Sequence, residues 1–313
     1  MFERARFQID AAVAINKGKR EFQEDAVLAD FAIGSRLGIV VLADGMGGHN
    51  AGDVASTLVT TEVFRELRYT TRFMLRDPAS IPGRLLSAAQ KVNGYLKRYI
   101  SENPNCEGMG CTLVIAVQTG KDLFWLSVGD SPVFLLRDGK MTRLNEEHSL
   151  APQIDYLAQQ GVLTPEQART HPDRSVLTSA INGQEIRYVD CSDAPFSLKN
   201  GDALIVASDG LCSLKPSEIA RVIRENADRT CAKASEKVLS AIRMADCPDQ
   251  DNVCFALMKV SDERADEQMR INEIRAANAL PLMADNGATE AQPKKPMRQL
   301  TRILRAVSRT PNP

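Results

Sequence analysis

The chain has 313 residues, of which 39 are basic and 40 acidic, so its formal net charge is −1. Apolar residues make up 43% and charged residues 25% of the chain, which is typical of globular proteins and excludes disordered and collagen-like classes. No window approaches the run of about 18 apolar residues that a membrane-spanning helix needs. A dedicated nucleic-acid binder usually carries a basic excess, so we expect neither a transmembrane segment nor a nucleic-acid partner.

The cysteines and the N-terminus predict a cytoplasmic protein. The seven cysteines are odd in number and no two have C-x-x-C spacing, which is typical of reduced thiols rather than of a disulfide framework. Charged residues (Arg4, Arg6 and Asp10) interrupt the first apolar stretch, so the N-terminus does not resemble a secretory signal. Only three histidines are present, which leaves little scope for a zinc site.

The chain contains both short apolar runs and helical patterns. Runs rich in Val, Ile and Leu predict buried strands at 37–43, 113–117, 123–128, 203–207 and 253–260. Apolar residues at helical spacing predict helices over 53–67, 83–101, 217–226 and 230–245. Turn signals such as Asp138-Gly139 indicate hairpins, and strict alternation of strands and helices is missing. This pattern favours an antiparallel core covered by helices over a parallel doubly wound sheet.

Two segments stand apart from this core. Residues 147–179 contain three prolines and predict a helical excursion between strands. After Val260 the composition changes, so we expect a domain over 1–260 and a C-terminal extension over 261–313. Within the extension, apolar residues recur at helical spacing between arginines and predict a short basic amphipathic helix over 298–309. Such a helix would dock on a partner or an anionic membrane; the alternative is a flexible tail with a chance periodicity.

Carboxylates stand at the ends of several predicted strands. They are Glu24, Asp25, Asp44, Asp130, Asp209 and Asp251. Any one Asp-Gly pair at a strand end is an ordinary turn. Gathered at one edge of a core, however, the carboxylates would repel one another unless cations shared them. Hard divalent ions such as Mg²⁺ and Mn²⁺ prefer oxygen ligands, and two such ions activate a water for attack on phosphorus.

Six short motifs follow one another at compatible spacing over about residues 8–260. They are Arg20–Asp25 (REFQED), Ala43–His49 (ADGMGGH), Gly110–Thr112 (GCT), Gly129–Ser131 (GDS), Ser208–Leu211 (SDGL) and Asp251-Asn252. On these motifs the chain resembles the metal-dependent type 2C protein serine/threonine phosphatases, the PPM family, in their bacterial form. The resemblance implies an α+β fold, a central β-sandwich of two antiparallel sheets flanked by helices on both outer faces (four layers, αββα). Residues 147–179 resemble the family's flap beside the active site.

The resemblance also implies a metal centre with two Mg²⁺ or Mn²⁺ ions and a third, weaker one. Asp44 would bridge both ions, and Asp209 and Asp251 would bind the first. The second ion would be held by the Glu24 side chain and the Gly45 carbonyl.

Three further residues have roles that only the resemblance implies. Asp25 would orient a metal-bound water, and Asp130 with Asp209 would hold the third ion. Arg20 would bind the substrate phosphate, and the alternative for it is a surface arginine in a Lys-Gly-Lys-Arg run. Met46 stands where members outside the bacterial group often carry a histidine, so the general acid stays unassigned.

We therefore expect a protein serine/threonine phosphatase in which a metal-bridging hydroxide attacks phosphoserine and phosphothreonine in line. The expected partners are phosphorylated protein substrates and a cognate Ser/Thr kinase, and the expected oligomeric state is a monomer. One alternative is a weakly active phosphoprotein-binding or partner-switching module, against which the intact carboxylates argue. Another is a nuclease, which the aromatic content of 5% disfavours. The physiological substrate and the role of the extension stay open.

Overall fold

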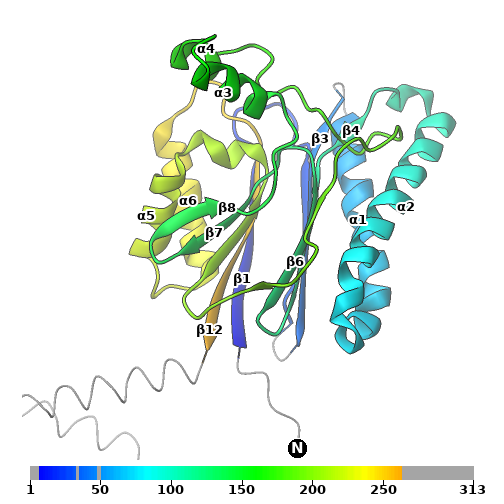
Figure 1. Cartoon of the computed structure of the whole chain (residues 1–313), viewed down its shortest axis with the longest axis vertical. Helices are drawn as coiled ribbons and strands as arrows, with labels where there is room; N and C mark the ends of the chain where they lie inside the picture. The colour runs from blue at the N-terminus through cyan, green and yellow to red at the C-terminus, as the bar shows by residue number, and fades with distance from the viewer. Residues whose placement is uncertain (1–6, 33–34, 48–50, 263–313) are drawn as a thin grey trace, which may run out of the picture. The chain divides into compact units, whose positions relative to one another are not determined.

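Two antiparallel sheets form the centre of the fold in the computed structural model, which describes residues 7–32, 35–47 and 51–262 (Figure 1). The first sheet has the strand order β1 (Phe7–Asn16), β12 (Val253–Asp262), β11 (Ala203–Ala207), β7 (Val133–Arg137) and β8 (Lys140–Arg143). The second has the order β10 (Phe196–Ser197), β6 (Asp122–Val128), β5 (Leu113–Thr119), β3 (Leu37–Met46) and β2 (Asp25–Asp30). Two short strands extend the second sheet: β4 (Gly110–Cys111) pairs with β3, and β9 (Asp190–Cys191) with β6.

Helices cover the outer face of each sheet. On the second sheet lie α1 (Ala51–Arg76) and α2 (Ile81–Glu102), and on the first lie α5 (Pro216–Glu225) and α6 (Cys231–Ala245) (Figure 1). The segment 147–179 carries α3 (Ala151–Gln159) and α4 (Pro165–Arg169). Short 3₁₀ helices in the described part of the chain occur at Pro78–Ser80, Pro104–Cys106 and Asp209–Ser213. The prediction of a four-layer α+β sandwich is confirmed.

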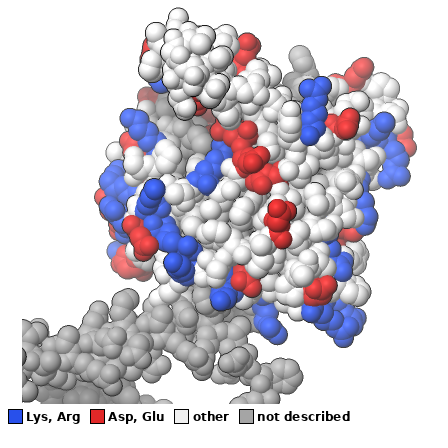
Figure 2. Space-filling view, in the orientation of Figure 1, with Lys and Arg blue, Asp and Glu red and all other residues white. Residues whose placement is uncertain are grey.

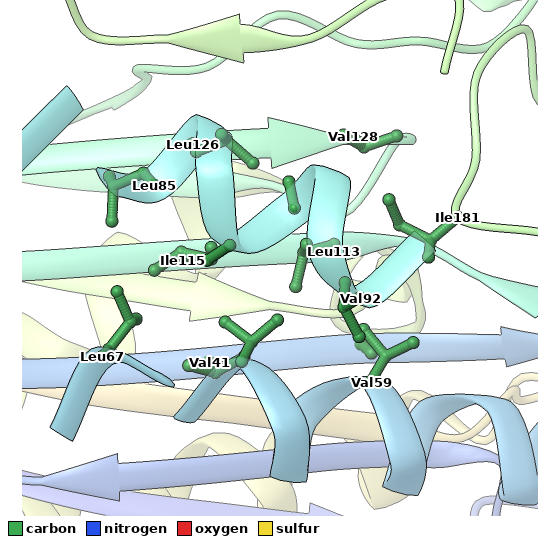
Figure 3. Packing of buried hydrophobic residues seen from close by; sticks show 14 of the residues in the cluster. Val41, Val59, Leu67, Leu85, Val92, Leu113, Ile115, Leu126, Val128 and Ile181 are labelled. Atoms are coloured by element: carbon green, nitrogen blue, oxygen red, sulfur yellow. The ribbon is translucent and has the colours of Figure 1, made fainter. Parts of the chain in front are cut away.

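The apolar pattern of the strands produces three hydrophobic interfaces, one between each pair of neighbouring layers of the four-layer sandwich. Because side chains alternate along a strand, Val41 of β3 packs against the helices while Leu42 faces the first sheet. The layer between the second sheet and its helices is shown in Figure 3, where Val41 and Ile115 of the sheet face Val59 and Leu67 of α1. Both faces of each central strand are therefore buried, which is why these strands read as continuous apolar runs.

Element boundaries depart modestly from the predicted ones. The first helix ends at Arg76 rather than at residue 67, because fully buried Met74 continues its apolar face beyond a polar stretch. The predicted helix over 298–309, the rest of the extension beyond 262, and Gly48 and His49 of the second motif lie outside the described residues. None of the helices in the described part of the chain is long and apolar enough to cross a membrane.

The burial of Leu42 between the sheets generates a stability prediction. Leu42→Ala should lower the free energy of unfolding by about 2–5 kcal/mol, because it removes a fully buried side chain from the apolar interface between the two sheets. Helices cover the outer face of each sheet, so water cannot easily fill the space that is left. Leu86→Ala is the matched control, since Leu86 of α2 is 37% exposed and should cost about 1 kcal/mol or less. Urea denaturation measures both, and equal losses would contradict the layer assignment.

Candidate metal centre

Strand ends from both sheets meet at one edge of the sandwich. In the second sheet, the start of β2 lies opposite the end of β3, so that Asp25 pairs with Asp44. In the first sheet, Asp209 follows β11 and Asp251 precedes its partner β12. The Ser208 hydroxyl donates to the Asp25 carboxylate across the sandwich at 2.7 Å, which joins the two sets of strand ends.

The structure brings five of the predicted acids together. The Asp44 carboxyl group lies close enough to those of Asp25 and Asp209 to affect the pKa values of both. Asp130 and Asp251 are near enough to repel the Asp44 carboxylate. Glu24 is placed differently, because its Oε1 lies against the start of α1, where a Cβ on Gly52 would be 2.5 Å away. The five aspartates thus form one cluster, with Glu24 beside it.

Burial dominates the electrostatics of this cluster. It raises the pKa of Asp25 to about 7 and that of Asp130 to about 7, and repulsion by Asp209 adds to both shifts. Burial also raises the pKa of Asp44 well above its usual range, with further repulsion from Asp25, Asp209 and Asp130. The pKa of Asp209 rises for the same reason, with repulsion from Asp251. Removing carboxylates from water disfavours their charged form. A bound cation would stabilise that charged form, so the cluster is suited to binding cations.

Two arginines approach the cluster from its rim. Arg20 Nη2 lies 2.5 Å from an Asp251 oxygen, and the Arg20 side chain is 57% exposed. Arg143 donates to the backbone carbonyl of Asp130 at 2.6 Å and to Glu147 at 2.7 Å.

On the face shown in Figure 2, acidic side chains gather near the centre and basic ones lie mostly toward both sides.

Glycines allow the backbone to approach closely at this edge. A Cβ on Gly45 would collide with the carbonyls of Gly52 and Glu24, and one on Gly210 would collide with the Asn252 carbonyl. The Gly45 amide also donates to the Glu24 carbonyl at 3.1 Å. Glycine is the residue type that fits such close approaches, which explains the Asp-Gly pairs on physical grounds.

Several polar residues that support the cluster were not assigned a role from the sequence. Asn252 accepts from the Glu24 amide at 2.7 Å and donates to the carbonyls of Lys17 and Phe22, which holds the loop that carries Arg20. Thr112 accepts from the Asp44 amide at 3.0 Å. These residues stand beside aspartates in the motifs, or in a short motif of their own, and that position was the available signal.

The donor set fits hard divalent ions. Carboxylate oxygens and a glycine carbonyl are the ligands that Mg²⁺ and Mn²⁺ prefer. Among the residues that the structure describes, no group of three or more His, Cys, Asp or Glu side chains is placed so as to hold a metal ion by protein ligands alone. Mg²⁺ usually keeps several waters, so a site for it needs only a few carboxylate oxygens.

The segment 147–179 is anchored beside Asp130. The His148 amide donates to the Gly129 carbonyl at 3.0 Å, and the Thr178 amide donates to the His148 carbonyl at 2.9 Å. Ser149 and Leu177 form an isolated antiparallel bridge at the base of the segment. The excursion predicted from the sequence therefore begins and ends next to the carboxylate cluster.

Comparison with known proteins gives consistent matches. The family model described as protein phosphatase 2C matches residues 16–311. The serine/threonine phosphatase stp of Listeria innocua is 33% identical over 204 residues, which are 63% of this chain and 78% of the relative. The Mycobacterium tuberculosis serine/threonine phosphatase PstP/Ppp superposes with a TM-score of 0.64 at 28% identity, covering 81% of this chain and 99% of that one.

A further solved structure is the PstP catalytic domain in complex with two manganese ions, with a TM-score of 0.64 at 27% identity, covering 82% of this chain and 100% of that one. These relatives are phosphatases by name and do not support the alternative of a weakly active binding module. Because the family model spans most of the chain, the chain belongs to the protein phosphatase 2C family, as its six motifs predict.

Proposed function

We propose that the cluster binds Mg²⁺ or Mn²⁺ for the hydrolysis of phosphoserine and phosphothreonine in proteins. The chain is a metal-dependent protein serine/threonine phosphatase, like the relatives that it resembles. The observation that carries the metal site is the convergence of five aspartates from both sheets on one edge. The raised pKa values of Asp25 and Asp130 mean that the cluster cannot ionise fully near neutral pH without bound cations.

Each carboxylate has an assigned place in this proposal. Asp44, at the centre of the cluster, would contact two ions; Asp209 and Asp251 would hold the first, and the Glu24 side chain with the Gly45 carbonyl would hold the second. Asp130, together with Asp209, would hold a third and weaker ion. When bound, the ions supply Lewis acidity and a water with a lowered pKa. The central position of Asp44 among the other acids supports its place at both ions.

Two residues act on the other reactants. One Asp25 oxygen accepts from Ser208, which fixes the carboxylate so that it can orient a water in the site. Arg20 stands at the exposed rim, where its guanidinium reaches two oxygens of an incoming phosphate. Its contact with Asp251 holds the guanidinium beside the cluster, which disfavours the alternative of an unconnected surface arginine.

The remaining assignments concern the cellular setting. A phosphatase for phosphoproteins needs a kinase that makes its substrates, so we propose a cognate Ser/Thr kinase as the counterpart. We propose a cytoplasmic location, which the seven free cysteines favour, and a monomer. Residues 1–260 are proposed as the catalytic domain, which the compact unit Met1–Asp266 supports, with 147–179 as a flap that selects substrates and 261–313 as an extension.

Asp209→Asn tests the ligand assignment. It should lower Mn²⁺-dependent hydrolysis of a phosphothreonine peptide by more than roughly 100-fold, because the amide is a poorer ligand for a hard ion. Asp249→Asn is the control, since Asp249 is an exposed carboxylate two residues before Asp251 and should leave the rate unchanged. EDTA should abolish the wild-type activity. A wild-type rate for Asp209→Asn, or activity that survives EDTA, would overturn the assignment.

Arg20→Ala tests phosphate binding. It should lower kcat/KM for the phosphopeptide by roughly 10- to 100-fold, because a hydrogen bond between charged groups is worth that much in affinity. Lys19→Ala is the matched control, because Lys19 is a neighbouring exposed cation that pairs with Asp246 at 2.8 Å, away from the cluster. Steady-state kinetics measure both variants, and equal effects would show that Arg20 acts only through general charge.

The raised pKa values predict how stability depends on pH in EDTA. The pKa values of Asp25 and Asp130 are about 7 in the folded chain against a usual 3.8, so between these pH values the folded state holds more protons than the unfolded state. Stability should therefore fall as the pH rises from about 4 to about 7. Mn²⁺ should restore stability at pH 7.5, and Asp25→Asn should flatten the pH dependence.

Denaturation midpoints at pH 5.5 and 7.5, with EDTA and with Mn²⁺, measure this effect. The Asp249→Asn variant should retain the wild-type pH dependence, because the Asp249 carboxylate is exposed outside the cluster. A metal-free chain that is more stable at pH 7.5 than at pH 5.5 would contradict the electrostatic account.

A further inference from the structure

A buried pair of hydroxyl groups joins the two sheets next to the carboxylate cluster. Thr112 lies between β4 and β5 of the second sheet, and Ser131 lies just before β7 of the first. Their hydroxyl oxygens are 2.8 Å apart. Thr112 is 2% exposed and Ser131 1% exposed, so water cannot readily replace this contact.

Thr112 is also held firmly on the side of the cluster. Its hydroxyl accepts from the Asp44 amide at 3.0 Å, and its own amide donates to the Asp44 carbonyl at 2.8 Å. Its methyl group packs against Gly129, where an added Cβ would lie 2.7 Å from Thr112 Cγ2. Hydrogen bonds and packing together fix the rotamer of Thr112. The position of the Asp44 backbone relative to Ser131 is therefore set through the Thr112 hydroxyl.

The other end of the pair lies next to Asp130. Ser131 follows Asp130 in the chain, and its carbonyl accepts from the Asn145 amide group at 3.0 Å, which holds the turn from the other side. A short path therefore runs from Asp44 through Thr112 and Ser131 to Asp130. The Ser208–Asp25 hydrogen bond is a second directional contact between the sheets near the cluster, whereas the interior of the interface is formed by apolar side chains, whose contacts are not directional.

We propose that Thr112 and Ser131 are positioning residues that fix the separation of Asp44 and Asp130 and thereby set the affinity for divalent cations. Metal ligands must be held within about 0.5 Å of their working positions, and a directional contact between the sheets provides that control. The inference rests on the proposed function, which assigns Asp44 and Asp130 to the metal centre.

The test is a double-mutant cycle on the full-length chain, with Mn²⁺ affinity measured by calorimetric titration of the metal-free protein. Thr112→Val keeps the shape of the side chain and removes its hydroxyl, and Ser131→Ala removes the other. Each should weaken Mn²⁺ binding by about threefold to tenfold, the worth of one hydrogen bond. The double variant should be no weaker than the weaker single one, because both substitutions break the same contact. Thr112→Ser, which keeps the hydroxyl, should retain most of the affinity.

Thr60→Val is the matched structural control. Thr60 is 1% exposed, and its hydroxyl donates within α1 to the Ser56 carbonyl at 2.8 Å. This variant should lower the unfolding midpoint without changing Mn²⁺ affinity. If Thr112→Val does not fold, the Mn²⁺ affinity of Ser131→Ala alone tests the positioning role, because this variant leaves the Asp44 amide bonded to Thr112.

The outcomes separate this inference from the proposed function. Wild-type Mn²⁺ affinity in Thr112→Val and Ser131→Ala, or effects that multiply fully in the double variant, would overturn the positioning role. In that case Asp209→Asn should still lose Mn²⁺ binding, and the metal centre would stand. Unchanged Mn²⁺ binding in Asp209→Asn would instead overturn the site itself.

Discussion

The repulsion among five aspartates gathered at one edge of the sandwich is the constraint on which the rest of this structure depends. Burial and mutual repulsion raise the pKa values of Asp25, Asp44, Asp130 and Asp209, which is unfavourable in the absence of cations. The sandwich tolerates this cost because the apolar layers behind the cluster are deep and covered by helices on both sides. The stability of the apolar layers therefore compensates for the unfavourable repulsion among the aspartates, which divalent ions would relieve.

The two-sheet architecture decides how that charge is shared. Asp25 and Asp44 come from adjacent strands of one sheet, whereas Asp209 comes from the other, so neither sheet alone builds the site. Backbone contacts at Gly45 and Gly210 bring neighbouring segments closer than a side chain would permit. Hydrogen bonds from Ser208 to Asp25 and between Thr112 and Ser131 then connect the two sheets beside the aspartate cluster.

Much of this site was predictable from residue types at strand ends, and some of it was not. Asp44 and Asp209 were found because each follows an apolar run and precedes a glycine. Asn252, by contrast, holds the Arg20 loop through residues more than 200 positions away, at Lys17 and Phe22. The motif marks Asn252 but not its partners, because the tertiary arrangement determines which groups a buried amide bonds to.

The sequence by itself determined the fold class, the family and the identity of the acids, because these follow from local periodicity and from motif order along the chain. Only the tertiary structure decided which acids lie close enough to repel one another and that Glu24 lies beside them, against α1. It also decided which hydroxyl groups form hydrogen bonds between the sheets. The physical reason is that burial and repulsion depend on distances between segments far apart in sequence. Period and spacing along a strand record which face a residue occupies, but not what lies across from it.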